Sequence, residues 1–575
     1  MDPRHRPRPI IEAFKASALA LVILVGAGCD RTATTDDALA DIISAHNLDG
    51  VPDAYPAIRG VDPFSPRVAL GRALFFSAQL SGDRDVSCAS CHHPFHGGSD
   101  GLSLAVGIAA ENPRLVGLQR RVDLARDLDP MARTVGGPNV PRHTLATVNA
   151  ALYTKVLLHD GRISVLREED GKTIYNTPES RFRTQGDLNA RGDLLAVQAR
   201  FPVVSFNEMR GFGEFYNLTP PQVRSAIEKR LRREPGWLPL FREAFAAPTS
   251  TPEEIITYDN IASALSEFQK TQVKVNTPWS RYVKGDPHAI TETQKAGALL
   301  FYRPVEAGGF GCASCHRGDF FTDEEMHAAG FPQLGRGKRA DGGDPGNFLV
   351  TQVAADRYRF RTPTLINVSV TAPWTHAGAF ESLPELVRYH ANPSEGIKRY
   401  DFSFGHLTQF ADEENPYPDA EALTRRTLSH LSDLLPGRTP DEKETAQLVA
   451  FIESLTDPCL LNSSCIQSFH ITPADNVDGH MMSLLLEAPA PPGERDTIEK
   501  SAPLPPIDPP PPVSLDALMA RTDCENHTPA RSGASESRFA ERASALGVNH
   551  AHHMTAEMYY SPAYGYSIEN TMIPF

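Results

Sequence analysis

Two copies of one five-residue pattern, C-x-x-C-H, constrain this chain more than any other feature. The first copy consists of Cys88, Cys91 and His92, and the second consists of Cys312, Cys315 and His316. Two thiols on one helical turn can bond to the two vinyl groups on one edge of a porphyrin. The histidine that follows then lies under the iron as its axial ligand. The pattern therefore predicts two covalently bound c-type haems with histidine as the proximal ligand of each.

A zinc site built from both cysteine pairs is the main alternative. Paired C-x-x-C zinc knuckles usually lie about 15–20 residues apart, whereas most of the folded chain separates the two pairs here. A redox-active C-x-x-C motif needs no following histidine, and it would not be expected twice. Both alternatives are weaker than the haem interpretation.

Residues 1–29 have the pattern of an export signal. Basic residues precede the apolar run ALALVILVGAG, which is too short to span a bilayer comfortably. The run leads into VGAGC, which is similar to the box in which bacterial lipoproteins are cleaved and lipidated, here at Cys29. A plain signal peptide is the alternative. Both predict a periplasmic protein, and the first adds a lipid anchor to the membrane.

The remaining cysteines lie near the C-terminal end. Cys459 and Cys465, in DPCLLNSSC, are close enough to form a disulfide in an oxidising compartment. Cys524 is left without an assigned role.

The sequence around each C-x-x-C-H pattern is repeated, which indicates a duplicated domain. GRALFF precedes the first pair and GALLFY the second, and each half ends in an amphipathic stretch, IASALSEFQKT or TAQLVAFIESL. We therefore expect a mainly α fold with two cytochrome c-like helical haem domains, at residues 52–285 and 286–466. The polar stretch 167–193 predicts a surface loop that lengthens the first half.

Composition changes after residue 456. Proline-rich stretches such as APLPPIDPPPPVS predict that residues 467–575 form a linker and a largely irregular tail. The cluster of His550, His552 and His553 could bind a metal ion, but a tail without such a site is the simpler interpretation. The formal net charge of −15 disfavours nucleic acid as a partner and suits a basic protein.

The repeated halves are similar to the bacterial di-haem cytochrome c peroxidase family, which includes the MauG-type enzymes. The similarity rests on LGRALFFSAQLSGDRDVSCASCH, DGR (160–162), CASCHRGDFFTD and FRTPTLINVSVTAPWTHAG, and it covers about residues 52–466. It implies that one haem reacts with hydrogen peroxide while the other passes or stores electrons. The ending TDPCLLNSSC resembles a MauG-like branch, whose electrons come from a protein substrate. The alternatives are a peroxidase supplied by a small cytochrome and a non-enzymatic electron-transfer cytochrome.

The resemblance also identifies candidate residues for the peroxide site. In VQARFPVVSFNEMRG, Glu208 matches the family's catalytic carboxylate, Pro202 a pocket proline and Gln198 a glutamine of the MauG-like pocket. A carboxylate beside bound peroxide can move a proton from one oxygen to the other, which makes water the leaving group. Taken singly, Glu208 and Gln198 are better interpreted as ordinary polar side chains. The agreement of the three spacings favours the pocket.

The sixth position of the first haem is expected to be open or filled by water. The stretch 101–141 contains no histidine and only one methionine, Met131. His93 and His96 lie too close to the attachment motif to be good candidates. An open position would let peroxide reach the iron.

For the second haem, the resemblance places the sixth ligand fourteen residues after the histidine of a P-x-x-H-x-G motif. Counting from His376 reaches His390, with Tyr389 as the alternative, although a solvent-facing helix histidine would look the same. Two imidazoles would close this iron to peroxide. His376 is expected near this haem without a ligand role, and Ala377 replaces the motif's usual aspartate.

Two departures from the family pattern concern the region between the haems. His159 stands where family members often have a tryptophan relay, and Trp374 is either a substitute or a packed aromatic. The family also binds calcium there, and the carbonyls of Thr371 and Pro373 match two of its ligands. His143 occupies the position of the asparagine ligand, and imidazole suits calcium poorly.

Overall fold

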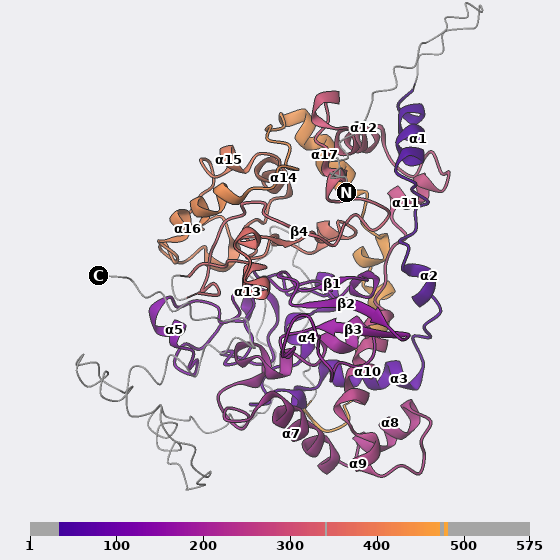
Figure 1. Cartoon of the computed structure of the whole chain (residues 1–575), viewed down its shortest axis with the longest axis vertical. Coiled ribbons are helices and arrows are strands. Elements are labelled where there is room, and N and C mark those ends of the chain that lie inside the picture. The colour runs from indigo at the N-terminus through magenta and orange to yellow at the C-terminus, as the bar shows by residue number, and fades with distance from the viewer. Residues whose placement is uncertain (1–33, 340–341, 472–475, 481–575) are drawn as a thin grey trace, which may run out of the picture.

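The computed structural model describes residues 34–339, 342–471 and 476–480. The fold is mainly helical, which confirms the predicted fold class, and its elements gather in two lobes (Figure 1). The export signal with Cys29, most of the predicted tail, Cys524 and the three tail histidines lie outside the described residues.

The first lobe contains most of the short helices and the larger sheet. The α-helices up to the boundary between the halves are α1 (Thr35–Ala45), α2 (Tyr55–Ile58), α3 (Pro66–Phe76), α4 (Cys88–Cys91), α5 (Pro130–Thr134), α6 (Leu194–Gln198), α7 (Pro220–Arg233), α8 (Trp237–Ala244), α9 (Pro252–Ile255), α10 (Tyr258–Lys270) and α11 (Pro278–Val283). Those of the second half are α12 (Glu292–Tyr302), α13 (Phe348–Thr351), α14 (Leu383–Ala391), α15 (Pro393–Gly396), α16 (Ala420–Thr427) and α17 (Glu442–Glu453).

Two small antiparallel sheets complete the described fold. Strands β1 (Val156–Leu157), β2 (Ile163–Glu169) and β3 (Lys172–Asn176) form one in the order β1-β2-β3, and β4 (Met326–His327) pairs with β5 (Phe360–Arg361) in the other.

The two lobes repeat one helix crossing, in which a glycine of the first helix meets the backbone of the last. A Cβ on Gly71 of α3 would collide with the Ala264 carbonyl and lie 2.9 Å from Cβ of Phe268 on α10. A Cβ on Gly297 of α12 would meet the Gln447 carbonyl and Phe451 of α17 in the same way, again at 2.9 Å. The matching geometry is what a duplicated domain is expected to preserve.

The two halves also meet through matching asparagines. Asn149 and Asn367 both have a positive φ, and the side-chain amide of each donates to the carbonyl of Lys274, at 2.9 and 2.8 Å. Lys274 lies between α10 and α11, where the halves join. The repeated segments RHTLATVN and RTPTLIN therefore both end at the carbonyl of Lys274.

The ends of the described chain cross to the opposite lobe. Helix α1 lies beside α12 of the second half, where Asp36 pairs with Lys295 at 2.7 Å, and Asp36 also accepts from Tyr282 of α11 at 2.7 Å (Figure 1). At the other end, Asp478 accepts from the Trp237 indole of α8 at 2.8 Å, and the His480 carbonyl accepts from Ala78 at 3.0 Å. The packed chain thus extends past residue 466, because it returns to bury apolar surface on the first lobe.

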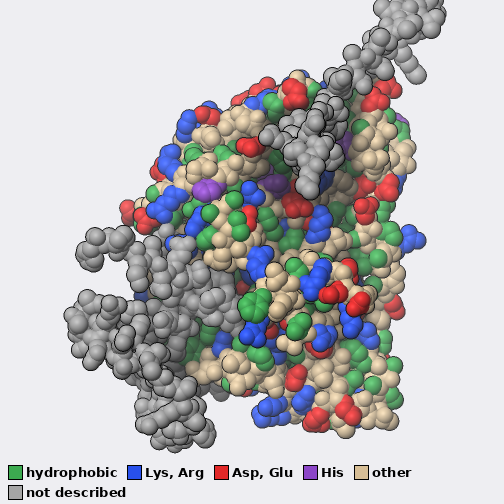
Figure 2. All heavy atoms as spheres, in the orientation of Figure 1, with side chains coloured by type: hydrophobic (Ala, Val, Ile, Leu, Met, Phe, Trp, Pro, Cys, Tyr) green, Lys and Arg blue, Asp and Glu red, His purple; other side chains and the backbone are tan. Residues whose placement is uncertain are grey.

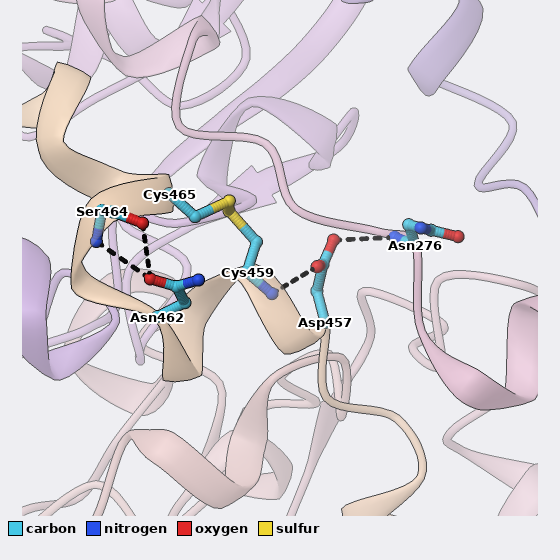
Figure 3. Close-up of a disulfide and its surroundings, with 6 residues drawn as sticks. All are labelled: Asn276, Asp457, Cys459, Asn462, Ser464 and Cys465. Carbon is cyan, nitrogen blue, oxygen red and sulfur yellow. Dashed lines mark hydrogen bonds between the residues drawn. A yellow bond between two sulfur atoms is a disulfide. The ribbon is translucent and has the colours of Figure 1, made fainter.

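A disulfide lies where the chain makes this return (Figure 3). Cys459 and Cys465 are bonded across two 3-10 turns, and Asp457 accepts from the backbone of Cys459 and Asn276, at 2.9 Å each. Ile466 and Phe469 follow and are buried beside Val148 and Phe95 of the first half. The bond therefore holds the segment that connects the lobes.

Residues 167–193 differ from the predicted surface loop. They begin inside a β-hairpin in which Glu169 pairs with Lys172 across Asp170 and Gly171, both with positive φ. An Asp-Gly pair between strands is a strong signal for a two-residue hairpin turn. The loop was predicted from the polar composition of this stretch. Exposed antiparallel strands also carry polar residues on one face, so polarity does not exclude a hairpin.

Acidic and basic side chains are interspersed on the face shown in Figure 2, without a broad patch of one sign. Among the described helices, none combines the length and apolarity needed to cross a membrane.

Replacing Gly297 with alanine is expected to destabilise the protein by about 2–4 kcal/mol, because the added methyl group meets backbone that cannot move aside. Helix propensity alone would favour alanine by about 1 kcal/mol, so a loss of stability would be caused by the collision at the helix crossing. Urea unfolding of the holoprotein measures the change, with Gly60→Ala as control because nothing lies within 4 Å of its added Cβ. Unchanged stability would show that the α12–α17 crossing is looser than described.

Candidate functional site: two haem cavities and the wall between them

Both attachment motifs fold into a single tight turn. The backbone N–H of His92 donates to the Cys88 carbonyl at 2.9 Å, and that of His316 donates to Cys312 at 3.0 Å. Each cysteine pair is thus held on one side of a turn with its histidine directly after it. This arrangement follows from the local sequence, and it recurs 224 residues along the chain.

The two proximal histidines are held by backbone carbonyls in the same way. Nδ1 of His92 lies 3.0 Å from the Gly98 carbonyl, and Nδ1 of His316 lies 3.2 Å from the Phe321 carbonyl. Burial lowers the pKa of both imidazoles, so both are neutral at pH 7. A neutral ring that donates through Nδ1 leaves Nε2 to bind a metal.

The four cysteines of the two motifs do not converge on a zinc site. Among the described residues, only Cys315, Asp323 and His327 form a group of three candidate ligands. Asp323 and His327 are an ion pair at 3.0 Å, and Cys315 belongs to a predicted attachment motif, in which its sulfur would bond to a haem vinyl carbon. Burial also raises the pKa of the Cys88 and Cys312 thiols to about 12.

The second motif opens into a cavity of about 300 Å³, termed the second cavity. Cys312, Cys315, His316, His376 and His390 line it. The ring centres of His316 and His390 lie 6.3 Å apart. With about 2.0 Å from an imidazole nitrogen to a first-row metal ion, two imidazoles that share an ion have ring centres about 6 Å apart. The donor set and the spacing therefore fit a haem iron with two histidine ligands.

Helix α14 separates the two candidates for the sixth ligand. His390 lines the second cavity, and burial together with the neighbouring His316 lowers its pKa to about 3, so it is neutral. Tyr389, on another face of the helix, donates its hydroxyl to the Gly330 carbonyl at 2.7 Å and packs against Phe380. The Tyr389 hydroxyl is thus already hydrogen-bonded to a backbone carbonyl.

Glu208 lines a separate cavity of about 370 Å³, termed the first cavity, together with Arg162, Met131 and Lys338. It lies on a π-helical turn, Phe206–Arg210, that ends at Gly211 with φ +69°. Gly107 packs so closely under this turn that an added Cβ would meet the Asn207 carbonyl. One Glu208 oxygen lies 4.0 Å from Arg162. A π-turn that presents a carboxylate to a cavity is a frequent feature of functional sites.

The other residues predicted for the peroxide site lie around this cavity rather than on its wall. Gln198 ends α6 and Pro202 begins the next turn, and neither is among the residues that line the first cavity, although Phe201 between them is. His93 and His96 pack near Phe95 and His470 instead. Met131 lines the cavity, with its sulfur 3.8 Å from the Thr134 hydroxyl of its own helix.

A row of buried charges separates the two cavities. This charged wall consists of Arg162, Asp160, Arg142 and Asp344. Arg162 lies 3.0 and 2.9 Å from the two Asp160 oxygens, Asp160 lies 2.7 Å from Arg142, and Arg142 binds Asp344 through two nitrogens at 2.7 and 2.9 Å. These residues were not predicted as site residues, apart from Asp160 and Arg162 as parts of a motif. Arg142 and Asp344 are 202 residues apart, and no local signal pairs them.

The residues expected to lie between the predicted haem sites, His159 and Trp374, also form hydrogen bonds with backbone carbonyls. His159 lies 3.0 Å from the His143 carbonyl through Nε2, and the Trp374 indole donates to Val368 at 2.8 Å. Trp374 is buried and His159 is half-buried, and both line the second cavity. Trp374 is therefore packed and hydrogen-bonded, as the simpler interpretation expects.

The predicted calcium ligands do not fit calcium. Nδ1 of His143 lies 2.8 Å from the Leu102 carbonyl. Burial lowers the pKa of His143 to about 4, against the opposing effect of the Leu102 and Thr371 carbonyls, so Thr371 faces an imidazole. Calcium takes six to eight oxygen ligands. The predicted set therefore includes a neutral imidazole where calcium prefers an oxygen ligand.

Two attachment motifs define a di-haem c-type protein. The second lines the second cavity, and the first lies close enough to Glu208 of the first cavity for that carboxylate's charge to act on Cys91 and His92. Residues 65–288 match the di-haem cytochrome c peroxidase family. The chain is 30% identical over 436 residues to the methylamine utilization protein MauG of Methylorubrum extorquens, which covers 74% of this chain and 95% of that protein. It is 27% identical over 360 residues to cytochrome c551 peroxidase of Pseudomonas aeruginosa, covering 63% and 81%.

Solved structures are similar at lower identity. A MauG-like protein associated with microbial copper homeostasis is 20% identical with a TM-score of 0.45, covering 70% of this chain and 92% of that one. The diheme peroxidase BthA of Burkholderia thailandensis is 18% identical with a TM-score of 0.44, covering 69% and 87%.

The chain belongs to the di-haem cytochrome c peroxidase family. It is therefore a peroxide-reactive di-haem oxidoreductase, and membership implies two c-type haems and an electron donor.

Proposed function

We propose that this protein is a MauG-like enzyme that uses hydrogen peroxide at the first haem to oxidise a protein substrate through the second. One observation carries the proposal: the two cavities differ in their side chains. At the second site, His316 and His390 have ring centres 6.3 Å apart. Near the first motif the carboxylate of Glu208 acts by its charge on Cys91 and His92, and the described lining of the first cavity offers no histidine as a second imidazole. That asymmetry suits one closed and one open iron.

The residues of the first cavity have separable roles in this proposal. A haem bound there would supply the iron to which peroxide binds. Glu208 would take the proton from one peroxide oxygen and deliver it to the other. Arg162, 4.0 Å away, would hold the carboxylate in place. Gln198 and Pro202 would shape the surroundings of the pocket from α6 and the following turn.

At the second site, His316 and His390 would hold the iron and exclude other ligands. A histidine pair gives a lower potential than a histidine–methionine pair, which suits holding an oxidised state better than accepting electrons from a high-potential cytochrome. A peroxidase supplied by a small cytochrome is the alternative, and a non-enzymatic electron-transfer cytochrome is the second alternative.

Export to the periplasm belongs to the same proposal. Residues 1–29 have the pattern of a signal, with Cys29 as the site of a lipid anchor, and the Cys459–Cys465 disulfide suits an oxidising compartment.

The first test is the resting ferric EPR spectrum of the haem-loaded protein, before and after one equivalent of hydrogen peroxide. We expect one high-spin and one low-spin signal, both lost on adding peroxide without prior reduction. Two low-spin signals that ignore peroxide would contradict the proposal. Repeating the test after half-reduction then separates a reductively activated peroxidase from an electron carrier.

A further inference from the structure

The charged wall connects the two cavities without a break. At one end, Arg162 lines the first cavity and lies 4.0 Å from Glu208. At the other end, the backbone N–H of Asp344 donates to Gln333 at 2.7 Å, and the Gln333 amide nitrogen lies 3.3 Å from Nε2 of His376, which lines the second cavity.

The orientation of Gln333 follows from its partners. Its oxygen accepts from the Asp344 backbone, so its NH₂ group faces His376 and donates to Nε2. His376 therefore carries its proton on Nδ1. The Phe360 ring adds a second contact, since His376 stacks on it at 4.0 Å and Arg142 lies over it at 5.7 Å.

Three chain segments cross the wall and place residues in both cavities. In 159–162, His159 lines the second cavity and Arg162 the first. In 333–338, Gln333 lines the second and Lys338 the first. Segment 139–143 runs from Asn139 in the first to His143 in the second. A displacement of these segments at one cavity would therefore be transmitted to the other cavity through the backbone as well as through the ion pairs.

The charges of the wall are permanent and buried. The side chains of Arg142, Asp160 and Asp344 are 6%, 2% and 4% exposed. Burial alone would raise the pKa of both carboxyl groups. Arg142 nevertheless lowers the pKa of Asp344 to about 2, and Arg142 together with Arg162 lowers the pKa of Asp160 below that of Asp344. Removing one partner leaves a buried charge uncompensated, so the neighbours must rearrange.

Arg142 is the shared element of this wall. Its Nε and Nη2 face Asp344 while Nη1 faces Asp160, so all three nitrogens are committed. If Asp344 loses its charge, Arg142 is free to turn toward Asp160, which then holds Arg162 less firmly. Arg162 approaches Glu208 through Nη2 alone, because its Nη1 is hydrogen-bonded to Asp160.

We propose that Arg162 is a positioning residue for Glu208, and that Asp160, Arg142 and Asp344 couple this position to the second cavity. The charge at the second site then influences how well the first site reacts with peroxide. This inference rests on the proposed role of Glu208.

A double-mutant cycle in the haem-loaded protein tests the coupling, using Arg162→Lys, Asp344→Asn and both together. The readouts are the bimolecular rate with hydrogen peroxide and the midpoint potential of the low-spin haem. Arg162→Lys should slow the peroxide reaction about 10-fold, because lysine cannot serve Asp160 and Glu208 together. Asp344→Asn should raise the low-spin potential and slow peroxide at least about 5-fold, and the double variant should be no slower than Arg162→Lys by more than about 2-fold.

Asp187→Asn is the matched control. Asp187 is equally buried and pairs with Arg200 at 3.1 Å, but it lines neither cavity, so both readouts should stay at wild-type values. If Asp344→Asn does not retain haem, Arg142→Lys replaces it, because it keeps the charge but loses the two-nitrogen contact. It should also slow peroxide at least about 5-fold and be non-additive with Arg162→Lys.

Effects that multiply, or a change confined to the low-spin potential, would overturn the coupling. A wild-type protein that ignores peroxide would instead overturn the proposed function, so the two failures are distinguishable.

Discussion

Replacing Glu208 with glutamine is expected to slow the reaction with hydrogen peroxide by about 10²–10⁴-fold, the range for loss of a general acid–base group. The amide keeps the size and the place on the π-turn but cannot carry a proton between the peroxide oxygens. Stopped-flow absorbance of the haem-loaded protein measures the rate. The resting spectra should be unchanged, because Glu208 contacts neither attachment motif through a hydrogen bond in the described chain.

Glu214→Gln is the control for this variant. Glu214 follows the same turn, is 49% exposed and pairs with Arg230 at 2.8 Å, but it does not line the first cavity. Its replacement should leave the peroxide rate within about 2-fold of wild type, because Arg230 keeps its contacts with the Gln79 and Ser81 carbonyls. A Glu208→Gln protein as fast as wild type would place the proton transfer on another group.

Replacing His390 with alanine is expected to convert the low-spin iron to a high-spin one, because the second cavity then offers a single imidazole. Ferric EPR measures the change, and added imidazole should restore the low-spin signal by filling the space left by the ring. His390→Met should keep six ligands and raise the midpoint potential by on the order of 100 mV.

Tyr389→Phe separates the two candidates on α14. It removes only the hydroxyl that donates to Gly330, so the EPR spectrum should stay that of the wild type. A low-spin signal that survives in His390→Ala, or vanishes in Tyr389→Phe, would move the ligand away from His390.

Several features could be predicted from the sequence because local chemistry decides them. Attachment of a c-type haem needs two thiols and a histidine within one turn, so Cys88, Cys91 and His92 can be read directly, as can their repeat at Cys312. The amphipathic stretches at 261–271 and 445–455 lie in α10 and α17 for the same reason. The hairpin at Asp170 and Gly171 was equally local and was missed.

Other features depend on residues far apart, and only the tertiary structure decided them. Arg142 meets Asp344 across 202 residues, and Asp36 and Asp478 bind the lobe opposite to their own sequence neighbours. The imidazole of His143 lies 2.8 Å from the Leu102 carbonyl, a contact between segments that only packing decides. The sequence by itself determined where the haems are predicted to attach. Which side chains surround them, and that a wall of ion pairs joins their cavities, follows from packing between segments that no local pattern connects.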